Sequence, residues 1–167
     1  CSSVIVIFLP FSASHASHQS IRAIESADGF LAFRITSVGG LGALSVAEGS
    51  KADLEQALKL DPTALQGSAY TSLGVLYSKV PGWPIGFGDN KKAKELLLKA
   101  LEQNPQGIDP NYFYADYLAG KRDWAQALRY LEIAKAAAPR PGRESADAGR
   151  QQEIAALLAK VQKKLKK

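Results

Sequence analysis

The stretch AKELLLKALEQNP (93–105) decides the fold, because the same spacing of residues occurs three times along the chain. The other two copies are SKADLEQALKLDP (50–62) and ALRYLEIAKAAAP (127–139). In each copy a small residue is followed by leucine four positions on, by alanine seven positions on and by proline twelve positions on. The first three of these residues share one face of a helix, where small side chains let a neighbouring helix approach closely. The pattern predicts three amphipathic helices, each ended by its proline.

The spacing between copies predicts a repeat architecture. Pro105 and Pro139 are 34 residues apart, which is the period of the tetratricopeptide repeat. The segment AYTSLGVLY (69–77) fits the first half of that repeat's signature, with Tyr70 in place of the tryptophan. The segment GKRDWAQAL (120–128) is typical of the turn into a second helix, with Trp124 as its aromatic residue. We therefore expect an all-α fold, a solenoid of antiparallel helix pairs forming a single domain over residues 17–167.

Start and stop signals give approximate helix limits. We expect a poorly marked pair over 21–60, broken near 38–42, and then helices over 61–79, 89–103, 109–118 and 124–138. Asp61-Pro62, Asp89 and Asp109-Pro110 are the expected N-terminal caps. A last helix from about residue 146 carries one apolar stripe, as the capping helix of a solenoid requires. The stripe consists of Ile154, Leu157, Leu158, Val161 and Leu165.

Composition and charge are those of a soluble globular protein. The 167 residues are 46% hydrophobic and 22% charged, and the net charge is +5. Much of the basic excess is near the C-terminus, which is weak evidence for an acidic partner. No aromatic residues are interleaved with these lysines, so we expect no nucleic-acid binding. The lysines are Lys160, Lys163, Lys164, Lys166 and Lys167.

The first residues predict export. The apolar run VIVIFLPF (4–11) is followed by SASHAS (12–17), with Ser14 and Ala16 at the spacing that signal peptidase needs. We expect residues 1–16 to be the remnant of an export signal and the protein to be periplasmic or otherwise exported. The alternative is that Cys1 is a lipidated N-terminus.

Few residues suit catalysis or cofactor binding. Cys1 is the only cysteine, and His15 and His18 flank the expected cleavage point. The folded part therefore lacks a thiol nucleophile, a cysteine metal site and the usual general base. Asp109 and Asp116 could pair with Asp89 as acids, although helix capping accounts for two of the three. We expect no enzyme activity, no cofactor and no metal.

The stretch PGWPIGFG (81–88) interrupts the helical pattern. Pro62 and Pro105 are 43 residues apart, so this stretch is an insertion between the two helices of one repeat. Burying Trp83 or Phe87 would remove about 150–250 Å² of surface from water, so we expect the loop to fold back. One interpretation is a structural plug, for which Trp83→Ala would cost roughly 3 kcal/mol. The other is that Trp83, Ile85 and Phe87 form a pocket wall or a partner-contact surface.

Two further stretches contain candidate binding residues. The stretch GIDPNYFYADYL (107–118) contains three candidates for binding on the inner face of the solenoid, namely Asn111, Tyr112 and Tyr114, and Tyr77 of the helix expected over 61–79 is a fourth. The alternative is that these residues pack the helices together. In PRPGRESADAGR (139–150), three arginines form either an anion-binding cluster or a solvated linker with helix-capping charges. They are Arg140, Arg143 and Arg150.

The stretch TSLGVLYSKVPGWPIGFGDNKKAKELLLKALEQNPQGIDPNYFYADYL (71–118) resembles exported bacterial tetratricopeptide proteins similar to the periplasmic T component of TRAP transporters. The likeness covers roughly residues 51–161. It implies a helical solenoid with a pore or groove for a small apolar ligand, working beside a periplasmic solute-binding protein. The T components are lipoproteins that form rings. The expected function is therefore a non-enzymatic binding scaffold for a protein partner or apolar ligand. The alternative is an envelope assembly protein that acts as a homo-oligomer.

Overall fold

The computed structural model of the chain describes residues 41–166, with side chains from Leu44 onward. The expected export signal and the first helix of the N-terminal pair lie outside these residues. The described part contains α2 (Leu41–Leu60), α3 (Ser68–Lys79), α4 (Asn90–Gln103), α5 (Ile108–Gly120), α6 (Trp124–Ala136) and α7 (Glu144–Leu165). A short 3₁₀ turn, η1 (Ala64–Gly67), precedes α3. Residues 41–166 contain helices and no strand, so the all-α prediction is confirmed.

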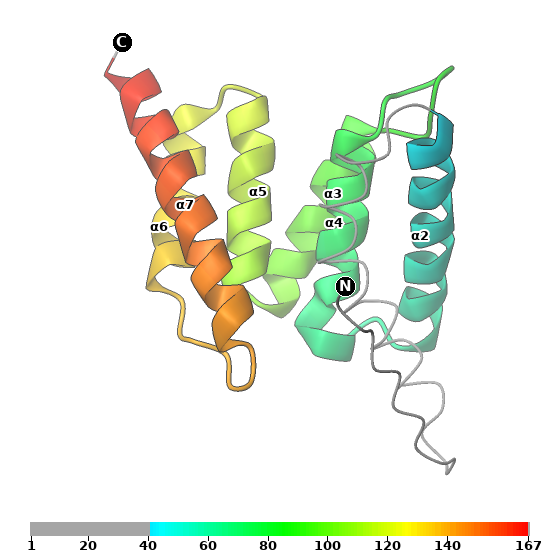
Figure 1. Cartoon of the computed structure of the whole chain (residues 1–167), viewed down its shortest axis with the longest axis horizontal. Coiled ribbons are helices and arrows are strands. Elements are labelled where there is room, and N and C mark those ends of the chain that lie inside the picture. Colours follow the sequence, from blue (N-terminus) through cyan, green and yellow to red (C-terminus); the bar gives the residue numbers. More distant parts are fainter. Residues whose placement is uncertain (1–40, 167) are drawn as a thin grey trace, which may run out of the picture.

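Successive helices run in opposite directions and lie side by side (Figure 1). Each helix packs against the next one along the chain, from α2 to α7. In addition, α3 packs against α5 and α5 packs against α7, so alternate helices also touch. The loop between α3 and α4, the turn between α5 and α6 and the end of α7 therefore lie at one end of the molecule, the upper edge of Figure 1.

The recurring leucines and alanines are in the core, as their spacing predicts. Leu54, Leu97 and Leu131 are fully buried. The alanines of the same pattern are at most 2% exposed; they are Ala57, Ala93, Ala100, Ala127 and Ala134. Burial of one leucine contributes about 1.5–3 kcal/mol to folding, so each of the three leucines is a substantial contributor to stability.

Gly74 explains the Leu-Gly pair of the repeat signature. A Cβ atom at Gly74 would lie 2.8 Å from Cγ of Leu97 and 3.2 Å from its backbone nitrogen. Both distances are shorter than ordinary van der Waals contact. The absence of a side chain at Gly74 therefore lets α3 approach α4 closely.

The buried residues form two hydrophobic clusters. The first lies between α2, α3 and the start of α4, and it includes Leu73 and Leu96. The second lies between the rest of α4 and α5, α6 and α7, and it includes Leu97, Leu101 and Ile154. Helix α4 contributes buried residues to both clusters, so it forms the common wall between them.

The predicted start of α3 at Asp61-Pro62 is wrong. Asp61 Oδ1 accepts hydrogen bonds from the backbone nitrogen of Thr63 at 2.8 Å and from its hydroxyl at 2.7 Å. The chain then passes through η1, where Leu65 and Gln66 have positive φ angles of 48° and 55°. A right-handed helix cannot continue through such residues, so α3 begins only at Ser68.

The other two expected caps have different outcomes. Asp89 caps α4 as predicted, because its side chain accepts hydrogen bonds from the backbone nitrogens of Lys91 and Lys92. The prediction for Asp109 is wrong, since α5 begins at Ile108 with Gly107 at the N-cap position. Asp109 instead forms ion pairs with two arginines, described below.

The apolar stripe of α7 is buried along most of its length. Ile154, Leu157, Leu158 and Val161 are at most 8% exposed, as expected, whereas Leu165 is 45% exposed at the end of the helix. The last predicted residue of the stripe is therefore wrong, because α7 extends beyond the helices that cover it. No helix within residues 41–166 is long and apolar enough to cross a bilayer.

Candidate functional site

Backbone hydrogen bonds fix the loop between α3 and α4, which spans residues 80–89. The Asp89 nitrogen donates to the Tyr77 carbonyl at 3.0 Å, and the Gly88 nitrogen donates to the Pro81 carbonyl at 2.9 Å. A Cβ atom at Gly88 would lie only 1.9 Å from the carbonyl oxygen of Val80. The beginning and the end of the loop therefore approach each other so closely that only glycine fits at position 88.

Phe87 anchors the loop on the first hydrophobic cluster. Its ring meets the ring of Tyr77 edge-on, with 5.4 Å between the centroids. Tyr77 is 5% exposed, and the ammonium group of Lys92 lies 4.8 Å from its ring centroid. Lys51 approaches the Phe87 ring at 5.7 Å. The prediction that the loop folds back is confirmed for Phe87, and Tyr77 serves as the surface on which it rests.

The tip of the loop, residues 81–85, points into solvent. Trp83 is 91% exposed and Ile85 is 70% exposed. The plug interpretation is therefore wrong for Trp83, and so is the expected cost of roughly 3 kcal/mol for Trp83→Ala. The physical reason is that Phe87 already fills the space beside Tyr77. Two apolar side chains on a hydrogen-bonded loop remain uncovered within the described part of the chain.

Asn111 fastens the turn between α4 and α5. Its side-chain nitrogen donates to the carbonyl of Pro105 at 2.9 Å and to that of Gly107 at 2.7 Å. The residue is fully buried. Its position gives it a structural role in this turn.

The tyrosines of α5 lie among other aromatic rings. Tyr114 is 5% exposed, with the Tyr130 centroid 4.8 Å from its own and the ring of Tyr117 stacked at 6.2 Å. Burial raises the pKa of Tyr114. Burial also raises the pKa of Tyr112 to about 12, and the guanidinium of Arg150 lies 4.8 Å from the Tyr112 ring centroid. Of the seven predicted site residues, only Trp83 and Ile85 are exposed.

Arg140 and Arg150 are neither solvated nor free to bind an anion. Arg150 Nε lies 2.7 Å from Asp109 Oδ1, and Arg140 Nε lies 2.8 Å from Asp147 Oδ1. Arg140 also pairs with Asp109. Arg150 lies 4.3 Å from the Phe113 ring centroid. Both interpretations are wrong for Arg140 and Arg150, because the carboxylates of α5 and α7 already occupy the two guanidinium groups. Arg143 forms no ion pair within residues 41–166 and lies at the N-cap position of α7, after the exposed positions 141 and 142.

The three aspartates considered as an acid pair take part in separate interactions. Asp89 caps α4, Asp109 pairs with arginines, and Asp116 forms an ion pair with Lys79 at 2.6 Å. Each carboxylate is held by cationic or N–H donors.

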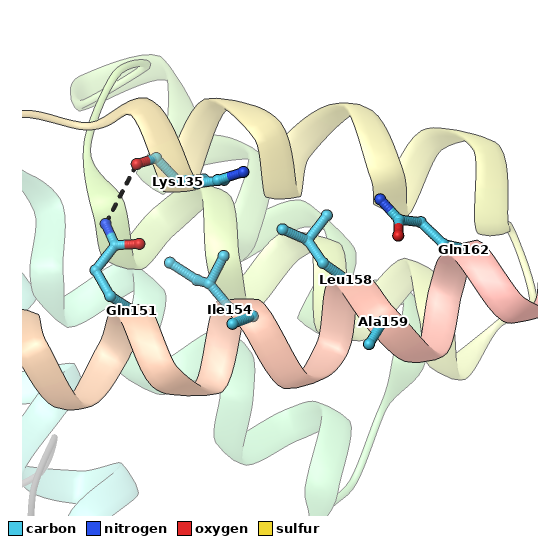
Figure 2. A pocket seen from close by; sticks show the side chains of 7 residues that line it. Lys135, Gln151, Ile154, Leu158, Ala159 and Gln162 are labelled. Atoms are coloured by element: carbon cyan, nitrogen blue, oxygen red, sulfur yellow. Dashed lines mark hydrogen bonds between the residues drawn. The ribbon is translucent and has the colours of Figure 1, made fainter.

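A shallow groove lies between α6 and α7 (Figure 2). Ile154 and Leu158 point from α7 toward α6, and the side chain of Gln151 donates to the Lys135 carbonyl at 3.3 Å. The groove has a volume of about 280 Å³, at the lower limit of ordinary ligand pockets of about 300–1,000 Å³. None of the seven predicted site residues lines it.

Comparison of the sequence with protein-family models gives no match, and no curated protein matches it.

Proposed function

We propose that this protein is a non-enzymatic scaffold built from tetratricopeptide repeats, which attaches to another macromolecular surface through the tip residues Trp83 and Ile85. In this proposal α3 with α4 and α5 with α6 are two successive repeats, and α7 is the capping helix. The support for the repeats is the burial of the recurring leucines and alanines, together with the packing of α3 on α5 and of α5 on α7.

The observation that carries the binding role is the 91% exposure of Trp83 on a loop whose base is hydrogen-bonded and anchored by Phe87. An exposed tryptophan on an ordered loop is costly to keep in water unless another surface covers it. Because the loop is already ordered, little conformational entropy is lost when Trp83 makes a contact. The resemblance to TRAP T components makes a periplasmic solute-binding protein the protein partner to test first.

The proposal is tested by site-specific cross-linking in cells. A photoreactive phenylalanine analogue replaces Trp83, and a matched variant carries it at Gln56, an exposed position on α2. We expect a discrete adduct, with protein or lipid, at position 83 and none at position 56. Equal labelling at the two positions, in variants whose far-UV circular dichroism is unchanged, would contradict the proposal.

Self-association is the second candidate function, and the groove between α6 and α7 favours it. The groove has an apolar floor, formed by Ile154 and Leu158, at the end of the helical array. A helix from another copy could pack there, as helices pack along the array. Sedimentation at increasing concentration tests this, with Ala159→Glu as the variant, because Ala159 lines the groove at an exposed position. A concentration-independent monomer would exclude assembly of this kind.

A further inference from the structure

The charges of the molecule are unevenly distributed between its two ends. We call the end that carries residues 79–92, 116–124 and 162–166 the tip end; it is the upper edge of Figure 1. Six basic residues lie there on exposed positions, at the start of α4, in the turn between α5 and α6 and at the end of α7, and within residues 41–166 none of the six forms an ion pair. They are Lys91, Lys121, Arg122, Lys163, Lys164 and Lys166.

Three acidic residues of the tip end are engaged in other interactions, whereas Glu48, at the start of α2 beside the same loop, is exposed and forms no ion pair within residues 41–166. Asp89 and Asp123 accept hydrogen bonds from backbone nitrogens at the start of α4 and α6. Asp116 pairs with Lys79. These carboxylates keep their charge, but residues 79–92, 116–124 and 162–166 carry eight basic and three acidic side chains, so the tip end has an excess of positive charge even with Glu48 included.

The opposite end of the molecule is different. There Arg140 and Arg150 contact Asp109, and Arg140 also contacts Asp147. Lys59, Lys135 and Arg143 at this opposite end form no ion pair within residues 41–166, but Asp61, Glu102, Glu132 and Glu144 lie at the same end and balance their charge. The excess of positive charge is therefore concentrated at the end from which Trp83 and Ile85 project.

From this arrangement we propose that the tip end docks on an anionic lipid membrane, with Trp83 and Ile85 inserted at the level of the headgroups. The inference rests on the proposed function, since it names the surface that the tip residues contact. Tryptophan prefers the membrane–water interface, where its ring is buried and its N–H group stays hydrated. Basic side chains near such a surface are attracted by the anionic headgroups.

Two observations favour a membrane over an acidic protein. Five of the six basic residues are lysines, whereas protein interfaces are enriched in arginine and depleted in lysine. The basic residues also extend from the start of α4 to the end of α7, across the part of the molecule that lies beyond α2 (Figure 1). A broad, diffuse positive surface around a narrow apolar tip is complementary to a flat anionic sheet of lipid.

The test uses the full chain and vesicles of phosphatidylcholine with or without phosphatidylglycerol. We expect sedimentation with the vesicles that contain phosphatidylglycerol, weakened by salt, and a blue shift of tryptophan emission that is absent from Trp83→Ala. Lys163→Gln combined with Lys164→Gln should lower the partition coefficient about 25-fold, since one lysine near an anionic surface is worth about 1 kcal/mol, or about fivefold. Lys59→Gln combined with Lys135→Gln removes the same charge from the opposite end and should change it little.

Three outcomes would overturn the inference. The first is no binding to either kind of vesicle. The second is equal losses from the two double variants, which would mean attraction without orientation. The third is unchanged binding of Trp83→Ala combined with Ile85→Ala. If vesicles are not bound but position 83 cross-links to a protein, the membrane inference fails and the proposed function stands, with an acidic protein as the contact.

Discussion

Two glycines within helices should respond in opposite ways to substitution by alanine. At Gly74 in α3, the new Cβ atom would lie 2.8 Å from Cγ of Leu97, which is fully buried. At Gly49 in α2, no described atom lies within 4 Å of the new Cβ position. The two substitutions add the same methyl group to a helix, so they differ in packing alone.

The expected magnitudes follow from two opposing effects. Alanine is favoured over glycine inside a helix by about 0.8–1 kcal/mol. Overpacking of a close-packed core costs about 1–3 kcal/mol, and Leu97 has no solvent side toward which to move. We therefore expect Gly49→Ala to raise the free energy of unfolding by up to about 1 kcal/mol. We expect Gly74→Ala to lower it by about 1–2 kcal/mol, since the steric cost exceeds the gain in helix propensity.

Urea denaturation followed by far-UV circular dichroism measures both values under the same conditions. The comparison between the two variants is the decisive result, because each serves as the control for the other. If Gly74→Ala stabilised the protein as much as Gly49→Ala, the close contact between α3 and α4 would not exist, and the role assigned to the glycine of the repeat signature would be refuted.

Trp83→Ala should change the free energy of unfolding by less than about 0.5 kcal/mol, whereas Phe87→Ala should lower it by about 1–2 kcal/mol. Urea denaturation of the two variants measures both values. Similar losses in the two variants would contradict the separate roles of Trp83 at the tip and Phe87 as the anchor. Asp109→Asn should lower the free energy of unfolding by about 3 kcal/mol, because it leaves the partly buried guanidinium of Arg150 beside a neutral group. Thermal unfolding measures this loss, with Asp89→Asn as the control at a surface position. Tyr112 should titrate with a pKa of about 12, raised by burial. Its folded pKa exceeds the unfolded value of about 10, so its contribution to stability is complete below pH 10 and is lost as the pH rises toward 12. Ultraviolet titration measures this pKa, and unfolding at alkaline pH should be weaker in Tyr112→Phe.

The core could be predicted from the sequence because periodicity determines which face of a helix is buried. Leu54, Leu97 and Leu131 share one position in the repeated pattern, and all three are fully buried. The cap at Asp89 was also predictable, because it depends on residues two and three positions away. Local interactions of this kind are visible in the sequence itself.

The functional surface was less predictable, since it depends on contacts that the sequence does not display. The direction of Trp83 is set by the backbone of an irregular loop, and the place beside Tyr77 is occupied by Phe87. The partners of Arg140 and Arg150 include Asp109, which lies 31 and 41 residues away along the chain. No local spacing signals such a pair.

The charge of the tip end was missed for a different reason. Lys91, Lys121 and Lys163 belong to separate segments and come together only because the helices alternate in direction. If the charged residues are sorted by the end of the molecule at which each predicted antiparallel helix begins or stops, these three lysines fall in one group.

Helix α4 has a consequence for any attempt to divide the protein into smaller pieces. A fragment ending at Gln103 would keep the first cluster but leave Leu97 and Leu101 without the residues of α5, α6 and α7 that cover them. A fragment beginning at α5 would lack the same two leucines from its own interior. Truncation between α4 and α5 therefore damages both products, and the loop can be studied only on the intact protein.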